Sequence, residues 1–122
     1  MTSSRQRLGQ RGEEIAKRRL ESDGYKVLEA NYRAGRVEID LVAEQGGVLV
    51  FVEVRTRRGP SYGPPEESIT PSKQAHLVAA AHAYLQLHDA AARDWRIDVV
   101  AINLSRDGQV ARLDIIRNAV EL

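Results

Sequence analysis

The 122-residue chain has no cysteine, and it has no apolar run near the roughly 18 residues that a membrane span needs. The lack of cysteine excludes disulfide bonds and thiolate metal sites, zinc fingers among them. The N-terminal segment MTSSRQRLGQRGEE also lacks the apolar run of a signal peptide. We therefore expect a protein of the cytoplasm with no membrane partner.

Hydrophobic residues make up 43% of the chain, which is enough for one core and too little for two at this length. We expect a single domain over residues 1–122, with 1–5 disordered. The formal net charge is only +1, yet residues 1–36 hold nine Lys or Arg against five Asp or Glu. The basic side chains of this N-terminal third either form a solvated helix face or contact phosphate, and the charge pattern favours neither.

Hydrophobic periodicity and turn residues predict seven elements. Apolar residues at helical spacing, with Gly24 as a stop, indicate a first helix. Thr70-Pro71 indicates the start of a second, because threonine caps a helix and proline fits its first turn. The expected helices cover about residues 6–23 and 70–88, and the expected strands cover 25–33, 37–44, 48–55, 95–102 and 110–116. The order αβββαββ predicts an α/β fold with one mixed central sheet flanked by the helices.

The second and third strands should form a hairpin whose register is fixed by its turn. A two-residue turn at 46–47 would pair Gln45 with Val48, so that the numbers of paired residues sum to 93. Asp40 and Glu53 then stand directly opposite each other, with Cβ atoms about 4.5 to 5.5 Å apart. Both strands are apolar enough on both faces to be central and buried. Two carboxylates so placed repel each other, and something must compensate this repulsion.

A divalent cation is the simplest compensation, because Mg²⁺ favours one or two carboxylates together with waters and a substrate phosphate. The sequence therefore predicts a Mg²⁺ or Mn²⁺ site that includes Asp40 and Glu53. The alternative is a structural ion network, because the same register places Glu38 opposite Arg55 and lets Arg55 reach Glu53.

Two residues outside the hairpin can reach this site. At about 100° per residue, Glu13 borders the apolar stripe of the first helix, whereas Glu14 points to solvent. Glu13 therefore either joins the carboxylates or pairs with Lys17 four residues on. Lys73 lies on the apolar stripe of the second helix, in its first turn, where its charge opposes the helix dipole. It either meets an anion, the carboxylate pair or a phosphate, or extends to solvent. The three histidines, six residues apart on this helix, cannot share a site.

Several segments are similar to those of the YraN family of uncharacterised bacterial proteins, and the similarity covers nearly the whole chain. It rests on GEEIAKRRLESDGYKVLEANYR, VEIDLVAE, LVFVEVRTRR, YGPPEESITPSKQ and RIDVVAI. The resemblance implies a PD-(D/E)xK nuclease-like fold, which is the restriction-endonuclease-like fold, related to archaeal Holliday-junction resolvases. It also implies that Asp40 and Glu53 are the motif carboxylates and that Glu13 is the carboxylate of the first helix.

Glu53-Val54-Arg55 departs from the motif, because arginine stands where catalytically active relatives usually carry lysine. A guanidinium stays protonated, so Arg55 can bind phosphate or stabilise charge but cannot deprotonate water. Water activated by the metal, or Lys73, would then have to supply that function. The expected catalytic residues are Asp40, Glu53, Arg55, Lys73 and Glu13. The expected metal ligands are Asp40, Glu53, Glu13 and the carbonyl oxygen of Val54.

The sequence therefore favours a metal-dependent endonuclease that acts on DNA more than on RNA, in a branched or otherwise structured form. We expect nucleic-acid contacts from Arg11 on the first helix and from a Gly/Pro-rich loop, where Arg57 and Arg58 precede Tyr62. Tyr62 either stacks on a base or holds the loop. The alternatives are a nucleic-acid-binding module that has lost turnover with its lysine and a protein-interaction scaffold. A homodimer is also considered, because cutting both strands of a junction needs two sites.

Overall fold

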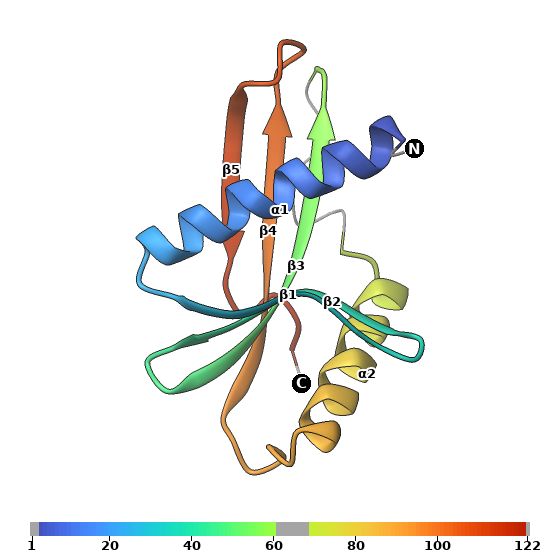
Figure 1. Ribbon diagram of the computed structural model, residues 1–122, viewed down its shortest axis with the longest axis vertical. Coiled ribbons are helices and arrows are strands. Elements are labelled where there is room, and N and C mark those ends of the chain that lie inside the picture. The colour runs from blue at the N-terminus through green and yellow to red at the C-terminus, as the bar shows by residue number, and fades with distance from the viewer. Residues whose placement is uncertain (1–2, 61–68, 122) are drawn as a thin grey trace.

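The computed structural model describes residues 3–60 and 69–121, and it has the predicted order of elements (Figure 1). Two helices and five strands follow one another as α1 (Ser4–Ser22), β1 (Lys26–Ala34), β2 (Val37–Gln45), β3 (Val48–Arg58), α2 (Pro71–Leu87), β4 (Trp95–Leu104) and β5 (Val110–Ile116). The predicted α/β class and the order αβββαββ are confirmed. Neither helix in the described ranges is both long enough and apolar enough to cross a membrane.

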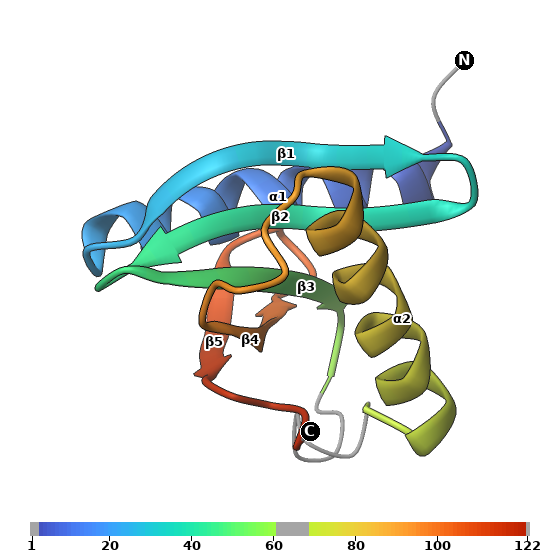
Figure 2. The same cartoon turned by 90° about the horizontal axis from the view of Figure 1, so that it is seen from below.

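All five strands form one mixed sheet in the order β1-β2-β3-β4-β5. Neighbours are antiparallel except β3 and β4, which are parallel because α2 connects them as a crossover. β1 and β2 run across the direction of β4, β5 and the C-terminal part of β3, whose far ends extend beyond them (Figure 1). Helices α1 and α2 lie against opposite faces of the sheet (Figure 2). The sheet is therefore flanked by one helix on each face, as the sequence predicts.

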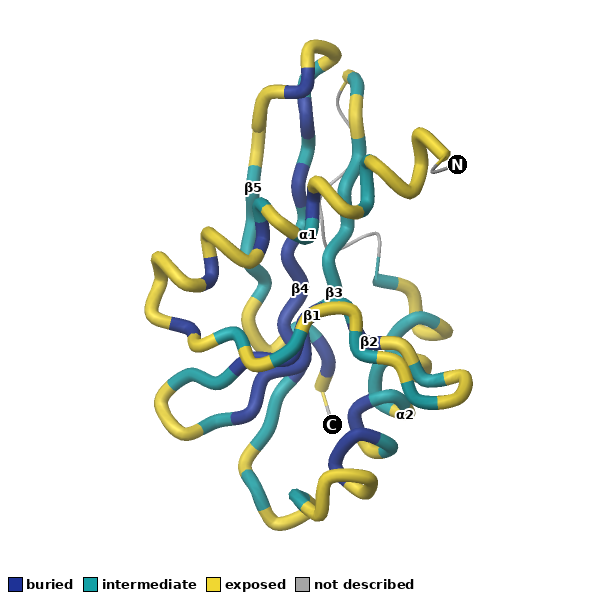
Figure 3. The backbone as a smooth tube through the Cα atoms, viewed as in Figure 1, coloured by how far each residue is buried: buried dark blue, intermediate teal, exposed yellow. Residues whose placement is uncertain are grey.

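Each helix buries its own cluster of apolar side chains against the sheet. On one face, Ala16 and Leu20 of α1 pack with side chains of β2, β3 and β4. On the other face, Tyr84 of α2 packs with residues that include Phe51 of β3. The most buried backbone follows β4 and the crossing of β2 with β3 (Figure 3). β2 and β3 are therefore central strands, as predicted, and their polar side chains are partly shielded from water.

The β2–β3 hairpin has the register that its turn predicts. Both glycines of the turn, residues 46–47, have positive φ, which glycine adopts without strain. Gln45 pairs with Val48, and the pairing continues in step as far as Leu41 and Val52. The two strands separate beyond that pair, so regular pairing ends one residue short of the two carboxylates.

Beyond this fork, β3 is paired on one side only. It runs to Arg58, three residues past its predicted end at Arg55, because β4 pairs with it as far as Leu104. Within the described residues, the opposite edge of β3 has no strand partner over residues 53–58. This open edge lies under the N-terminal half of α1 (Figure 1).

α1 begins earlier than the sequence predicts, because a capping box closes its N-terminus. The Ser3 hydroxyl accepts a hydrogen bond from the Gln6 N–H (3.1 Å), and the Gln6 side chain accepts one from the Ser3 N–H (2.9 Å). Residues 3–5 therefore form an ordered helix start, where the sequence predicts disorder over 1–5. The spacing S-x-x-Q is the sequence signal for this start.

α1 approaches β3 closely at Gly12. A Cβ atom at Gly12 would lie 1.7 Å from Thr56 Oγ1 and 2.8 Å from Thr56 Cβ, so no side chain fits there. Glycine is required at this position because a side chain would clash with Thr56, and not because the backbone has a positive φ. The contact holds α1 against the open edge of β3 one residue before Glu13, and so it fixes where Glu13 lies relative to the hairpin.

Gly12→Ala is expected to lower the free energy of unfolding by about 1–3 kcal/mol, because the added methyl group forces α1 away from β3. Urea denaturation measures the change. Gly9→Ala is the matched control on the same helix, because a Cβ there meets nothing within 4 Å, and it should stabilise the protein. Adding Thr56→Ala to Gly12→Ala removes the closest atom and should recover part of the loss. Equal effects of the two glycine substitutions would contradict the close contact.

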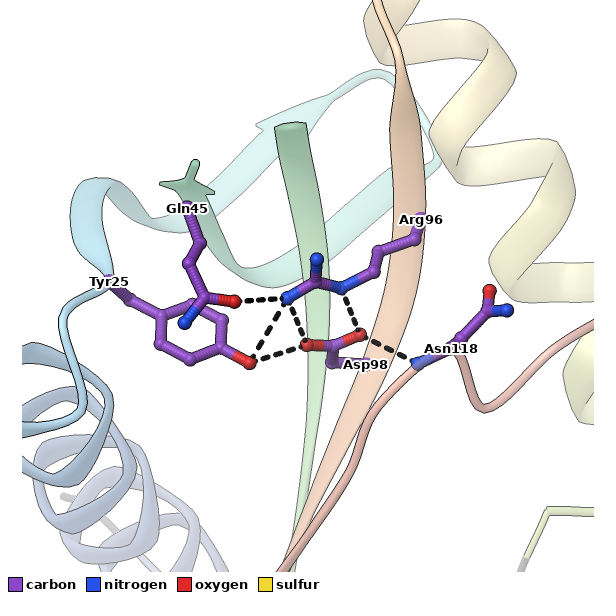
Figure 4. Close-up of polar contacts among 5 residues, drawn as sticks. All are labelled: Tyr25, Gln45, Arg96, Asp98 and Asn118. Carbon is purple, nitrogen blue, oxygen red and sulfur yellow. Dashed lines mark hydrogen bonds and ion pairs between the residues drawn. The ribbon is translucent and has the colours of Figure 1, made fainter. Parts of the chain in front are cut away.

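A buried polar network joins distant parts of the chain to β4 (Figure 4). Asp98 has no exposed surface, and its carboxylate accepts hydrogen bonds from the Tyr25 hydroxyl (2.8 Å), Arg96 Nε (2.9 Å) and the Asn118 N–H (2.9 Å). Arg96 also donates to the Gln45 side chain (2.6 Å). One carboxylate thus connects the segment after α1, the β2–β3 hairpin and the C-terminal segment to β4.

Candidate functional site

Asp40 and Glu53 lie at the fork where β2 and β3 separate. In place of a further strand pair, the Asp40 carboxylate accepts a hydrogen bond from the Val54 N–H (2.8 Å). The predicted closeness of the two carboxylates is retained, because they line the same cavities and the charge of Glu53 acts on Asp40. They therefore face each other at a fork between strands and not within a continuous ladder.

The Asp40 carboxyl group is held where its charge is unfavourable. Burial, and after it the charge of Glu53, raises the pKa of Asp40 from 3.8 to about 7. The Val54 N–H and the charge of Lys73 act in the opposite direction and do not cancel the increase. Asp40 is thus partly protonated near neutral pH, and a cation beside it would replace that proton. Strong pKa perturbation of this kind is typical of functional sites.

Lys73 reaches the carboxylates from the first turn of α2. The Thr70 hydroxyl caps this helix by accepting from the Lys73 N–H (3.2 Å), and Pro71 occupies the first helical position. Lys73 Nζ lies 3.3 Å from Glu53 Oε1, and the two side chains are 35% and 15% exposed. Of the two outcomes that the sequence leaves open, Lys73 thus meets the carboxylate pair.

Glu13 faces the same cavity from α1, whereas Glu14 is exposed, as the helical periodicity predicts. The Glu13 Oε1 atom is buried and has no hydrogen-bond partner. Burial raises the pKa of Glu13, a hydrogen bond from the Asn31 side chain acts against the increase, and neighbouring glutamates add to it. Within the described residues, the alternative ion pair with Lys17 is not formed. Glu13 is therefore a second acid that the fold keeps in an unfavourable position.

The alternative ion network of the hairpin is formed only in part. Glu38 pairs with Arg33 of β1 (3.1 Å), so it does not take Arg55 as its partner. Arg55 instead lines the cavity that contains Asp40 and Glu53. In the part of the chain that the structure describes, no basic side chain lies within ion-pair distance of Asp40. Glu53 therefore pairs with Lys73, whereas Asp40 accepts the Val54 N–H and, among the described residues, has no basic side chain as a partner.

Two cavities meet at the carboxylates, because Asp40 and Glu53 line both. The first, of about 490 Å³, lies beside α2, where Lys73 and His76 line it. The second, of about 570 Å³, lies between α1 and the open edge of β3, where residues 54–58 line it. An extended ligand can therefore pass the carboxylates on both sides.

Sequence reasoning missed the position of His76. Comparing the three histidines with one another showed only that they cannot share a site. The useful comparison is with Lys73, which lies three residues earlier and therefore on the same face of the helix. That spacing is the signal that places His76 in the cavity beside Lys73.

The residues predicted to contact nucleic acid lie mainly on the α1 side of the carboxylates. Arg57 and Arg58 line the cavity beside the open edge of β3. Arg58 also lines a neighbouring cavity together with Arg11, whose guanidinium donates to the Gly108 carbonyl (2.8 Å). Tyr62 lies outside the described residues. Three of the four predicted contacts are thus brought near one another.

The donor atoms at the fork suit a hard divalent cation. Asp40 and Glu53 both offer oxygen, and the N–H and C=O of a residue in an extended strand point to the same edge, which puts the Val54 carbonyl on the Asp40 side. Within residues 3–60 and 69–121, no three His, Asp or Glu side chains are placed to hold one ion together. Glu13 is therefore a neighbour of the pair. Two carboxylates completed by water and phosphate are the ligand pattern typical of Mg²⁺.

Residues 12–102 match the family described as "Uncharacterised protein family UPF0102". A UPF0102 protein of Roseiflexus castenholzii is 49% identical over 122 residues, covering 99% of this chain and 98% of that protein. The chain belongs to the UPF0102 family. A UPF0102 protein of Dehalococcoides mccartyi is 42% identical over 120 residues, covering 98% of each chain. The resemblance to the YraN family, based on the sequence motifs, is confirmed.

The part of the chain that matches UPF0102 includes the charged side chains around the fork. It contains Glu13, both carboxylates of the fork, Arg55 and Lys73. Among solved structures, an XisH family protein from Nostoc punctiforme aligns with a TM-score of 0.43 and 12% identity, over 84% of this chain and 97% of that chain.

Proposed function

We propose that this UPF0102 chain is a divalent-metal-dependent endonuclease that hydrolyses phosphodiester bonds of DNA in a branched or otherwise structured form. The observation that carries the proposal is the pair formed by Asp40 and Glu53 at the fork. The fold holds these carboxylates together although burial and repulsion raise the pKa of Asp40 to about 7. It also places a lysine and two cavities beside them, which a purely structural acid pair would not need.

Each residue of the site has a role in this reaction. Asp40 and Glu53 would hold Mg²⁺ or Mn²⁺, with the Val54 carbonyl as a further ligand, and Glu13 would add negative charge from α1. A bound cation would supply Lewis-acid chemistry and lower the pKa of its water. Lys73 stabilises the negative charge that develops on the phosphate, since its ammonium group already lies beside Glu53. A homodimer would supply the two sites that cutting both strands of a junction requires.

Arg55 supports a second candidate function. Its guanidinium binds phosphate and stabilises charge but cannot accept a proton from water. His76 lines the same site and carries an imidazole, the side chain best suited to proton transfer near neutral pH. If His76 and the cation do not replace the motif lysine, the same fold is a nucleic-acid-binding module without turnover.

Purified protein with Mn²⁺ is expected to cleave at least one DNA from a panel of branched, flapped and linear substrates. Asp40→Ala should reduce the rate on the order of 10²-fold or more, because it removes a ligand from the metal pair. Glu14→Ala is the matched control, since Glu14 is an exposed acid of α1 next to Glu13 and should leave the rate unchanged. A wild-type rate no higher than that of Asp40→Ala on every substrate would show that the endonuclease proposal is wrong.

Arg55→Lys separates the two candidate functions in the same assays. A gain of Mn²⁺-dependent cleavage would identify an enzyme weakened by its arginine. Salt-dependent DNA binding with no cleavage by either protein would identify the binding module. If the protein neither binds DNA nor takes up Mn²⁺, the latter measured by calorimetric titration, the result would favour the protein-interaction scaffold.

A further inference from the structure

Asn31 of β1 has a backbone conformation that strands do not normally contain. Its φ is 53°, and among the described residues it is the only one within the five strands with a positive φ. This left-handed conformation is unfavourable for residues other than glycine, although asparagine tolerates it better than most. Strained residues of this kind cluster at functional sites, where the surrounding structure holds them in place. The position of Asn31 in the sheet therefore needs an explanation.

Asn31 lies across the strand pair from Asp40. Residues 30–32 of β1 run antiparallel to residues 39–41 of β2, and the regular pairing skips the central residue of each segment. Asp40 lies in turn at the fork where β2 and β3 separate. The strained backbone of Asn31 is therefore next to the carboxylate on which the candidate site depends.

Both strands change faces at this point. In a regular strand, residues three apart lie on opposite faces of the sheet. Ile39 and Val42 of β2 are three apart, yet both belong to the apolar cluster that packs with α2. Glu29 and Tyr32 of β1 are three apart, yet both contact Tyr84 of α2. The Glu29 carboxylate accepts from its hydroxyl (2.9 Å), and the Tyr32 ring lies 4.8 Å from its ring. Each strand thus contains one residue that breaks the alternation.

The break falls at Asp40 in β2. Leu41 packs with α1 and Ile39 packs with α2, and only Asp40 lies between them. Its side chain therefore points to neither face. The carboxylate extends along the sheet instead and accepts from the Val54 N–H of β3 (2.8 Å). This direction explains why Asp40 lines a cavity on each side of the sheet. The positive φ of Asn31 marks the matching break in β1.

The side chain of Asn31 also acts on the other acid beside the fork, because it forms a hydrogen bond with Glu13 of α1. We propose that Asn31 is a positioning residue of the candidate site: its left-handed backbone turns the Asp40 carboxylate into the gap between β2 and β3. The binding of a cation by Asp40 in this gap rests on the proposed function, whereas the direction of its side chain does not.

The Val54 N–H reports where Asp40 points, because Asp40 is its hydrogen-bond acceptor. NMR of the ¹⁵N-labelled protein in EDTA measures the chemical shift of this amide proton and its rate of hydrogen exchange. Asn31→Gly keeps the left-handed backbone without strain, whereas Asn31→Val opposes it, because a β-branched residue is a strong outlier at positive φ. Asn118→Val is the matched control. Asn118 is also exposed and has a φ of 51°, but it follows β5 and takes no part in the β1–β2 pairing.

Asn31→Val is expected to lose the hydrogen bond to the Val54 N–H, so this amide proton should move upfield and exchange faster. Asn31→Gly and Asn118→Val should keep the wild-type chemical shift. If Asn31→Val does not fold, Asn31→Ala takes its place and should show the same changes to a smaller degree. An unchanged Val54 amide in the valine or alanine variant of Asn31 would overturn the inference. Loss of the hydrogen bond in Asn31→Gly, or an equal change in Asn118→Val, would overturn it too.

The affinity for Mn²⁺, measured by calorimetric titration, gives a second comparison. Asn31→Val should lose about 10- to 100-fold in affinity, as is typical when a residue that orients a metal ligand is replaced. Asn118→Val should bind Mn²⁺ like the wild type. Equal affinities of these two variants would contradict a positioning role toward the cation.

The outcome is separable from that of the proposed function, because the Val54 amide is measured in EDTA and cleavage is measured in Mn²⁺. If the amide responds as expected and the wild type neither takes up Mn²⁺ nor cleaves DNA, the endonuclease is refuted and Asn31 still directs Asp40. If the wild type cleaves DNA and the amide is unchanged in Asn31→Val, the endonuclease is kept and the role of Asn31 is refuted.

Discussion

Asp40→Asn is expected to raise the free energy of unfolding by about 2–4 kcal/mol at about pH 8 in the absence of metal. Asp40 ionises at its ordinary pKa of 3.8 in the unfolded chain but only near pH 7 in the folded protein. Between these values the folded state binds more protons, so stability falls as the pH rises through this range. Asparagine carries no charge and keeps an oxygen that accepts from the Val54 N–H, so it avoids the loss.

Urea denaturation at several pH values checks this prediction. The difference between variant and wild type should be small near about pH 4 and should reach its full size above about pH 7. Glu14→Gln is the control for replacing an exposed acid by an amide. Glu53→Gln should reduce, but not abolish, the fall in the free energy of unfolding with rising pH. Burial is a larger cause of the raised pKa of Asp40 than the charge of Glu53 is. A variant less stable than the wild type at about pH 8 would contradict the prediction.

Mn²⁺ should narrow the difference in stability between the same two proteins. Binding to the folded state alone stabilises by about 2.7 kcal/mol at a concentration one hundred times Kd. The wild type should gain this stability, and Asp40→Asn should gain far less because it lacks one carboxylate ligand. Thermal melts with and without Mn²⁺ measure the effect independently of any cleavage. Equal stabilisation of both proteins would place the metal somewhere other than the fork.

Asp98→Ala is expected to lower the free energy of unfolding by about 3–5 kcal/mol, because it leaves Arg96 without its partner in a largely buried site. The Tyr25 hydroxyl and the Asn118 N–H also lose their acceptor (Figure 4). A typical domain is stable by only about 5–15 kcal/mol. The variant should therefore be close to unfolding at ordinary temperature.

The neighbouring strand provides the matched control for this substitution. Arg112 and Asp114 of β5 form an ion pair with the same spacing and a distance of 2.7 Å, but their side chains are 58% and 34% exposed. Asp114→Ala should therefore cost less than about 1 kcal/mol. Denaturation of both variants measures the contrast. Similar costs would mean that burial of the Asp98 network adds nothing to its strength.

The sequence predicted the elements of the site well, because each prediction depended on local geometry. Strand alternation and a two-residue glycine turn set the hairpin register, which brought Asp40 and Glu53 together. Helical periodicity distinguished Glu13 from its neighbour and turned Lys73 toward the sheet. In each case, the prediction concerned which face of a helix or strand a side chain occupies, and that follows from local periodicity or from one tight turn.

The Asp98 network shows where local reasoning stops. An aspartate between Ile97 and Val99 in a buried strand is a sign that a buried acid needs partners. Its partners, however, include Tyr25 and Asn118, which are 73 and 20 residues away along the chain. No periodicity relates such positions, because their closeness depends on how α1 and the C-terminal segment pack against the sheet.

By itself, the sequence determined the order of elements, the hairpin register and the carboxylate pair at its centre. Only the tertiary structure decided that β2 and β3 separate at these two carboxylates. As a result, Asp40 accepts a hydrogen bond from the Val54 N–H, and Glu53 forms an ion pair with Lys73. The pairing of β2 with β3 ends one residue before the carboxylates, and the contact at Gly12 sets α1 over the open edge of β3. These are long-range packing effects, so one chain segment alone cannot encode them. They turn the predicted repulsion of two carboxylates into a site with a cavity on each side.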